Sequence, residues 1–99
     1  MAAEATAHIK GADIEIGTVT SANPASIAAD AAGTVALTVT GADTGDIVFV
    51  NARALPDGLV VQGATVTAAN TVTVQLQNTT EAAVDADATD FEYLLVKVA

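Results

Sequence analysis

Residues 65–77, which read TVTAANTVTVQLQ, decide the fold class. Val72, Val74 and Leu76 alternate with threonine and glutamine, so one face of an extended strand is apolar and the other polar. Asn70 tolerates a positive φ better than most residues do, and it stands between two alternating runs. The stretch therefore predicts a β-hairpin with Asn70 in its turn and the three aliphatic side chains facing a core.

Short stretches with the same period of two recur along the chain, and Gly, Pro, Asn and Asp punctuate them. The alanine-rich residues 25–32 are too few for a stable isolated helix, so an irregular link or a short strand is expected near Ile27. Residues 56–58, Pro-Asp-Gly, have the composition of a tight turn. The expected strands are residues 13–16, 34–40, 47–50, 59–62, 65–67, 71–77 and 91–98.

About seven to eight short strands with turns every ~8–12 residues predict an all-β chain. The expected architecture is a compact antiparallel β-sandwich or a jelly-roll-like barrel. Residues 1–12 are small and polar, and they predict an N-terminal arm, either a frayed tail or a segment that docks on a neighbouring subunit. Residues 13–99 are then expected to form a single β-sandwich domain.

The composition argues against several classes of function. Three Lys and Arg residues against twelve Asp and Glu residues give a formal charge of −9, which disfavours nucleic acid and anionic membrane surfaces as partners. There is no cysteine, and His8 is the only histidine, so thiolate and multi-histidine metal sites are not expected. No apolar run is long enough to span a membrane, and the first residues do not resemble a signal peptide. We expect a protein that is made and kept in a cytoplasm, or in something assembled there.

Two groups of carboxylates are candidates for a metal site or a catalytic site. Asp85, Asp87 and Asp90 have a spacing that can hold Ca²⁺, but the glycine and glutamate of an EF-hand loop are missing, which favours a solvated acidic loop. Asp43 and Asp46 could serve as an acid/base pair in a small hydrolase, yet three aromatic residues in the whole chain are few for a sugar site. We therefore expect no enzyme, no catalytic residue, no metal site and no cofactor.

Two of the expected strands, residues 47–50 and 91–98, are apolar on both faces. A two-sheet sandwich has one interior, so such strands expose a patch unless something covers it. The alternatives are a barrel-like closure or covering loop, and an oligomer interface, with the trimer favoured. The candidate interface residues are Val48, Phe49, Val50, Phe91, Tyr93 and Leu95.

Arg53 is one of few cations and lies four residues before Asp57. It is either half of a local surface ion pair, which contributes little to stability, or a contact to an acidic partner, since arginine is enriched at interfaces.

The chain contains a series of turn and strand motifs, which are SIAA at 26–29, VALTV at 35–39, GDIVFV at 45–50, LPDGL at 55–59, TVTV at 71–74, NTT at 78–80 and VD at 84–85. Across residues 14–98 this series resembles a small β-rich domain found in virion proteins of tailed bacteriophages. Two features of this sequence differ from the pattern of that phage domain. Residues 51–54 lack the expected prolines, and we expect no larger attached domain, which favours a stand-alone decoration protein over a fibre module.

This resemblance implies a structural virion protein of the head decoration, or cement, type. Such a protein would bind the major capsid protein of the assembled head and stabilise it, as a homo-oligomer with the trimer favoured. Its place would be the head surface of the virion, after assembly in the host cytoplasm. The alternative is a receptor- or carbohydrate-binding module of a phage tail or fibre protein, against which the absence of tryptophan counts.

Overall fold

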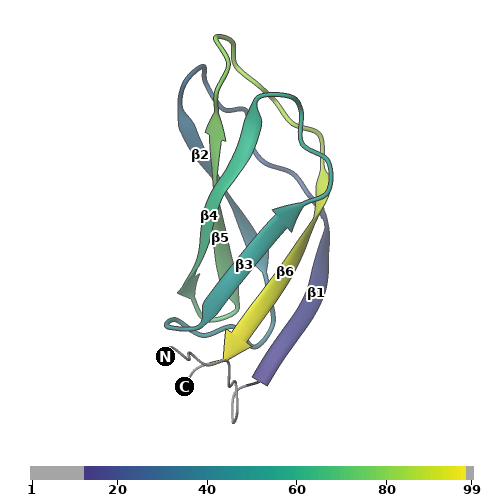
Figure 1. The fold of residues 1–99 in the computed structure, drawn as a ribbon, viewed down its shortest axis with the longest axis vertical. Helices are drawn as coiled ribbons and strands as arrows, with labels where there is room; N and C mark the ends of the chain where they lie inside the picture. Colours follow the sequence, from purple (N-terminus) through teal and green to yellow (C-terminus); the bar gives the residue numbers. More distant parts are fainter. Residues whose placement is uncertain (1–12, 98–99) are drawn as a thin grey trace, which may run out of the picture.

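Six strands and no helix make up the regular structure of residues 13–97, which are the residues that this computed structural model describes (Figure 1). The predicted arm at residues 1–12 lies outside them. The all-β class is confirmed. The strands are β1 (Asp13–Ala22), β2 (Ala32–Thr38), β3 (Ile47–Ala52), β4 (Leu59–Ala68), β5 (Thr71–Asn78) and β6 (Thr89–Lys97).

The predicted count of seven to eight strands is wrong, because two expected strands are one and another is only a bridge. Residues 59–62 and 65–67 both belong to β4, which continues through Gly63 with a shift of register between Val61 and Gly63. A glycine in a strand often marks such a bulge rather than a break. Ile27 forms an isolated bridge with Val84 instead of a strand.

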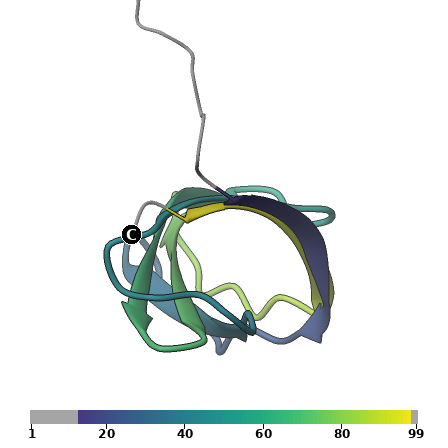
Figure 2. The ribbon, with the colours of Figure 1, turned by 90° about the horizontal axis from the view of Figure 1, so that it is seen from below.

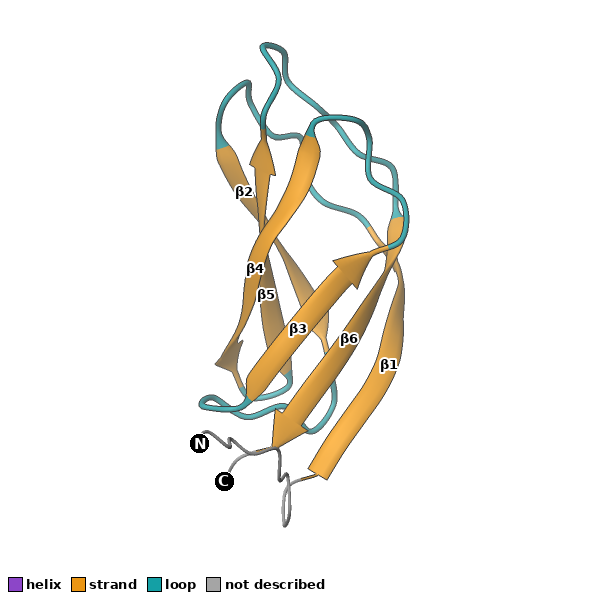
Figure 3. Ribbon diagram, in the orientation of Figure 1, coloured by secondary structure: helices purple, strands orange, loops and turns teal. Residues whose placement is uncertain are grey.

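The strands form two antiparallel sheets of three, with the orders β1-β6-β3 and β2-β5-β4 (Figure 3). Only β4 and β5 are neighbours both in sequence and in a sheet; every other connection passes from one sheet to the other. Asp13 at the start of β1 pairs with Lys97 at the end of β6, so the two ends of the described chain lie side by side.

The predicted β4–β5 hairpin is confirmed. Asn70 lies in its turn with a φ of 62°. The Asn70 side-chain Oδ1 accepts a hydrogen bond from the Gly41 backbone N–H at 2.8 Å, and its own N–H donates to the Ala42 carbonyl at 2.7 Å. The turn is therefore tied to the loop that leads from β2 to β3.

The core lies between the two sheets, which surround it when the molecule is seen from below (Figure 2). Val72, Val74 and Leu76 of β5 are fully buried, as the alternation predicts. Phe91 and Leu95 of β6 meet them from the other sheet and are fully buried too. The central strand of each sheet thus supplies the centre of the core.

A buried asparagine holds the loops at one end of the molecule. The Asn78 side chain is fully buried, and its Nδ2 donates to the carbonyls of Ile27 (3.0 Å), Ala28 (3.2 Å) and Ala82 (2.9 Å). Its Oδ1 accepts from the backbone N–H and the hydroxyl of Thr80. Burial of a polar group is tolerated when its hydrogen bonds are made in this way. The NTT motif at residues 78–80 therefore has a structural role.

Candidate interaction surface

The outward side of sheet β1-β6-β3 carries two cross-strand rows of apolar side chains. Successive residues of a strand point to opposite faces, so alternate residues of the three strands share this side. Register then decides which of them are neighbours. The first row is Ile14, Val96 and Ile47, and the second is Ile16, Leu94 and Phe49. We call these six residues the apolar face.

The apolar face is exposed to an unusual degree. Ile16 is 81% exposed and Phe49 is 62% exposed, while Ile14 and Ile47 are 45% and 48% exposed. Leu94 and Val96 on the central strand are half-buried by these neighbours. Single exposed apolar residues are common on proteins, but a contiguous group of this kind marks an interaction site on most soluble proteins.

A hollow of about 540 Å³ lies on this side of the sheet and reaches into the apolar face. Ile16 and Phe49 border it, and Leu94 lies between them on the central strand. Asn51 and Glu92 give it one polar border. The hollow is open and largely apolar, so its shape and chemistry suit an inserted apolar side chain.

An ion pair closes the apolar face at the end where β3 finishes. The Arg53 guanidinium donates to Glu92 Oε2 from Nη2 at 2.7 Å and from Nε at 3.1 Å, and its Nη1 lies 4.0 Å from Asp90 Oδ2. The hydrogen bond and the charge of Arg53 lower the pKa of Glu92 below its ordinary value. The same contacts raise the pKa of Arg53. Glu92 is therefore ionised and held in place at neutral pH.

A second ion pair lies where β6 finishes and β3 begins, on the core side of the sheet, because Lys97 shares the parity of Phe91 and Leu95. Lys97 Nζ donates to Asp43 Oδ2 at 2.8 Å and to the Gly41 carbonyl at 2.5 Å, and it lies 2.9 Å from Asp46 Oδ2. Hydrogen bonds to Asp43 and Asp46 raise the pKa of Lys97. The acid pair that the sequence offers for catalysis thus contacts a lysine.

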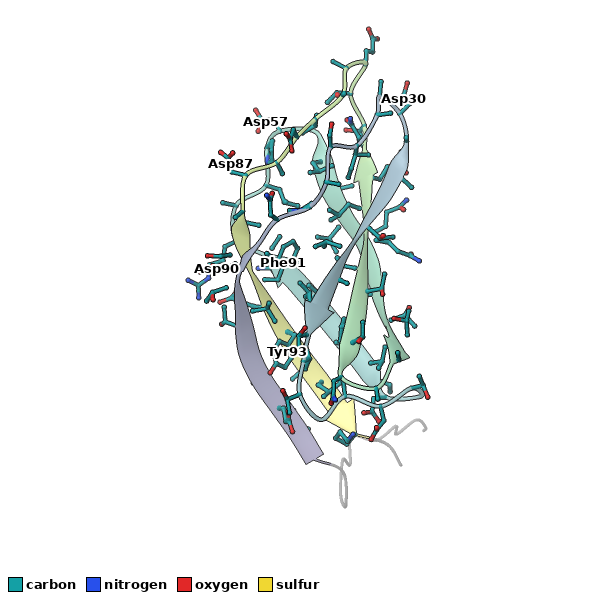
Figure 4. The ribbon with its side chains drawn as sticks, turned by 180° about the vertical axis from the view of Figure 1, so that it is seen from behind. Asp30, Asp57, Asp87, Asp90, Phe91 and Tyr93 are labelled. Carbon is teal, nitrogen blue, oxygen red and sulfur yellow. The ribbon has the colours of Figure 1, made fainter. Side chains whose placement is uncertain are left out.

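The predicted oligomer-interface residues do not form one exposed surface. Val48, Phe91 and Leu95 are buried in the core, so the expectation that they contribute to an exposed patch is wrong. Val50 and Tyr93 are partly buried and pack against the core, and the inward position of Phe91 and Tyr93 on β6 is visible in Figure 4. Phe49 alone of the six belongs to the apolar face.

Leu94 and Val96 are missing from the predicted interface because both sides of β6 are apolar in that half of the strand. Ile14 and Ile16 are missing because the alternation in residues 13–16 does not say that their side faces outward, and Ile47 is missing because both sides of β3 are apolar. One signal in the sequence could have separated the two sides of β6: Asp90 and Glu92 have the same parity as Leu94 and Val96. Charged side chains face solvent unless they are paired in the interior, so this parity marks the outward side. The opposite parity contains Phe91 and Leu95.

The other residues that the sequence offers as sites, Arg53 and the acids near Asp87, form no catalytic or metal-binding arrangement among the described residues. Arg53 pairs with Glu92 and Asp90 rather than with Asp57. Asp85 and Asp87 are exposed, and among the described residues no three His, Cys, Asp or Glu side chains lie close enough to hold a metal ion. Residues 13–97 also contain no helix with the length and apolar character to cross a membrane.

Comparison with known proteins gives no further guide to this surface: no family model matches the chain, and no curated protein or solved structure matches it either.

Proposed function

We propose that this protein is a non-enzymatic structural protein of a tailed-bacteriophage virion that binds the assembled head and reinforces it. The observation that carries the proposal is the apolar face: a surface of this kind is suited to association between the subunits of an assembly, and none of its six side chains is a reactive group. The motif resemblance over residues 14–98 supports the same class of function. The major capsid protein is the proposed partner, and the head surface of the virion is the proposed location.

The strand pairing supports a finer description of the fold, a jelly-roll-like β-sandwich. β1 pairs with β6, β2 pairs with β5, and β3 lies beside β4. This is the pairing of one long antiparallel ribbon wound around a core. Jelly rolls recur among viral capsid and lectin domains, so such a fold is compatible with the proposal without establishing it.

The proposed mechanism is mechanical. A rigid protein that binds the assembled lattice, and not its separated subunits, stabilises the lattice by mass action. The acidic character supports a location on an outer surface, since a net charge of −9 keeps the protein soluble and away from packaged nucleic acid. We also propose that the protein acts as a homo-oligomer, with the trimer as the form that the resemblance implies, and that Arg53 contributes to partner contact.

The proposal is tested by adding the purified protein to phage heads that have been emptied of DNA. We expect saturable binding, measured by co-sedimentation, and a higher melting temperature of the decorated heads, measured by calorimetry. An unrelated acidic β-protein of similar size serves as the control. Absence of binding to any head lattice would reject the proposal, and a clear hit on a glycan array in that case would favour a tail or fibre binding module.

A further inference from the structure

We infer that the apolar face is the surface through which copies of this chain associate, and that its occupant is a second copy of the chain. The inference builds on the proposed homo-oligomer by assigning it to one sheet, the β1-β6-β3 sheet, and to named residues. Three observations carry it: the area of the face, the charges around it and its relief.

The area of the apolar face is sufficient for a stable contact. Fully exposed side chains of this size present roughly 150–200 Å² each, so two such faces in contact remove on the order of 1,000 Å² of apolar surface. With the polar border added, the total approaches the ~1,200–2,000 Å² that specific interfaces bury. A contact that used Ile16 and Phe49 but left the rest exposed would fall short of that range.

The charges favour a second copy at this face, although each chain carries a charge of −9. No charged side chain belongs to either apolar row. Arg53 and Lys97, the two described Lys or Arg residues, each contact carboxylates, Arg53 at one end of the face and Lys97 on the core side of the same sheet. The acids Asp30, Asp57 and Asp87 lie in loops at the far end of the molecule (Figure 4). A contact between the two apolar rows of one copy and those of another therefore brings no carboxylate of the rows together.

The shape of the apolar face is self-complementary, because it contains both a projection and a hollow. Phe49 projects from β3 beside the hollow that it shares with Ile16. Each copy thus offers both a projecting ring and an apolar hollow on one surface, as an interface between identical surfaces requires. A dimer would give the whole face to one neighbour, and a trimer would divide it between two; both arrangements bury Ile16 and Phe49.

The first test measures mass in solution with light scattering after size exclusion and with sedimentation velocity, over a range of concentrations. We expect the wild type to be a dimer or trimer, and Ile16→Asp and Phe49→Asp to be monomers at the same concentration, with dissociation constants raised at least tenfold. Val60→Asp is the matched control, because Val60 is 45% exposed on β4 of the other sheet. It is expected to associate as the wild type does, and circular dichroism checks that all variants are folded.

A second measurement does not depend on disrupting the interface. The chain contains no cysteine, so Phe49→Cys and Val60→Cys each introduce a single thiol. We expect maleimide to modify the Phe49→Cys thiol progressively more slowly as protein concentration rises, and the Val60→Cys thiol at a constant rate.

The inference is overturned if the wild type is a monomer at every concentration, or if the Asp variants associate as the wild type does. Its failure is distinguishable from failure of the proposed function. A monomer that binds heads retains the function and loses the inference, whereas an oligomer that requires Ile16 and Phe49 but ignores heads retains the inference alone.

Discussion

Gly58 and Gly45 both adopt positive φ values, 86° and 96°, but only Gly58 is crowded by a neighbouring side chain. A Cβ added at Gly58 would overlap Thr80 Cγ2, while one added at Gly45 meets nothing within 4 Å. We expect Gly45→Ala to lower the free energy of unfolding by about 1–2 kcal/mol through backbone strain alone. Gly58→Ala is expected to cost about 2–4 kcal/mol, because overpacking is added to the strain.

Chemical denaturation of both variants measures this difference. The double variant Gly58→Ala with Thr80→Ser is the control, since serine keeps the hydroxyl that contacts Asn78 Oδ1 and removes the methyl group. It should recover part of the loss, and equal losses at the two glycines would contradict the packing at Thr80.

The Arg53–Glu92 contact predicts a pH dependence with a definite sign. Glu92 has a lowered pKa in the folded state, so its contribution to stability is present above its unfolded pKa and is lost as pH falls through the folded value. Arg53→Gln should therefore be less stable than the wild type at neutral pH, and the difference should vanish in acid. Both residues are exposed, so the difference is expected to be small.

Carbon-detected NMR titration of Glu92 is the direct measurement. Its pKa should lie below the ordinary glutamate value in the wild type and rise toward that value in Arg53→Gln. Lys97→Gln is the matched control because Lys97 contacts Asp43 and Asp46 instead. An identical Glu92 titration in the wild type and in Arg53→Gln would show that the contact does not persist in solution.

At the scale of a single strand, β6 offers a direct test of which side is inside. Leu95 is fully buried and Leu94, its neighbour, lies on the apolar face. Leu95→Ala should lower the free energy of unfolding by about 2–5 kcal/mol through the cavity it leaves. Leu94→Ala should cost under ~1 kcal/mol when measured on dilute monomer, since its side chain is only half-buried and little cavity forms.

The same chemical change on adjacent residues makes each variant the control for the other. Equal losses would mean that the two sides of sheet β1-β6-β3 are covered to the same extent, and a larger loss at Leu94 would reverse the assignment of the core.

Most strands could be predicted from alternation, but the inward side of a strand could be predicted only where its two sides differ in polarity. On β5 threonine and glutamine oppose Val72, Val74 and Leu76, and the predicted core is right. On β6 the C-terminal half is apolar on both sides, and hydropathy alone does not separate them. The apolar face itself required the register that places Ile16 beside Leu94 and Leu94 beside Phe49, which no single strand contains.

The extent of a strand was harder to predict than its presence. Gly63 predicts a break between two short strands, but β4 continues through it by means of a bulge. β1 extends to Ala22, well past the clear alternation at residues 13–16, because its pairing with β6 supplies hydrogen bonds that local sequence does not predict. Tertiary pairing therefore decided what local propensity left open.

At the scale of the whole molecule, the distribution of charge predicts how salt affects stability. Asp30, Asp57 and Asp87 lie in the loops at one end (Figure 4), while the two described cations pair with other acids, Arg53 with Asp90 and Glu92 and Lys97 with Asp43 and Asp46. Their mutual repulsion opposes folding and is screened by added salt. We expect the melting temperature of the dilute protein to rise by several degrees as sodium chloride is raised from low to physiological ionic strength.

Differential scanning calorimetry measures this effect. The double variant Asp57→Asn with Asp87→Asn should melt higher than the wild type at low salt and respond less to added salt. Asp43→Asn is the control, because Asp43 contacts Lys97 and its loss should lower the melting temperature. A wild type that does not respond to salt would contradict the repulsion.

The pairing of Asp13 with Lys97 has a mechanical consequence. A load applied between these two positions separates β1 from β6 by breaking their backbone hydrogen bonds one after another. The peak unfolding force should therefore be low. A load applied across the sheets instead strains many backbone hydrogen bonds at the same time. If this protein reinforces a shell against internal pressure, the tension must therefore act across the sheets and not between these two positions. Tags attached at residue 13 and at residue 97 would lie next to each other.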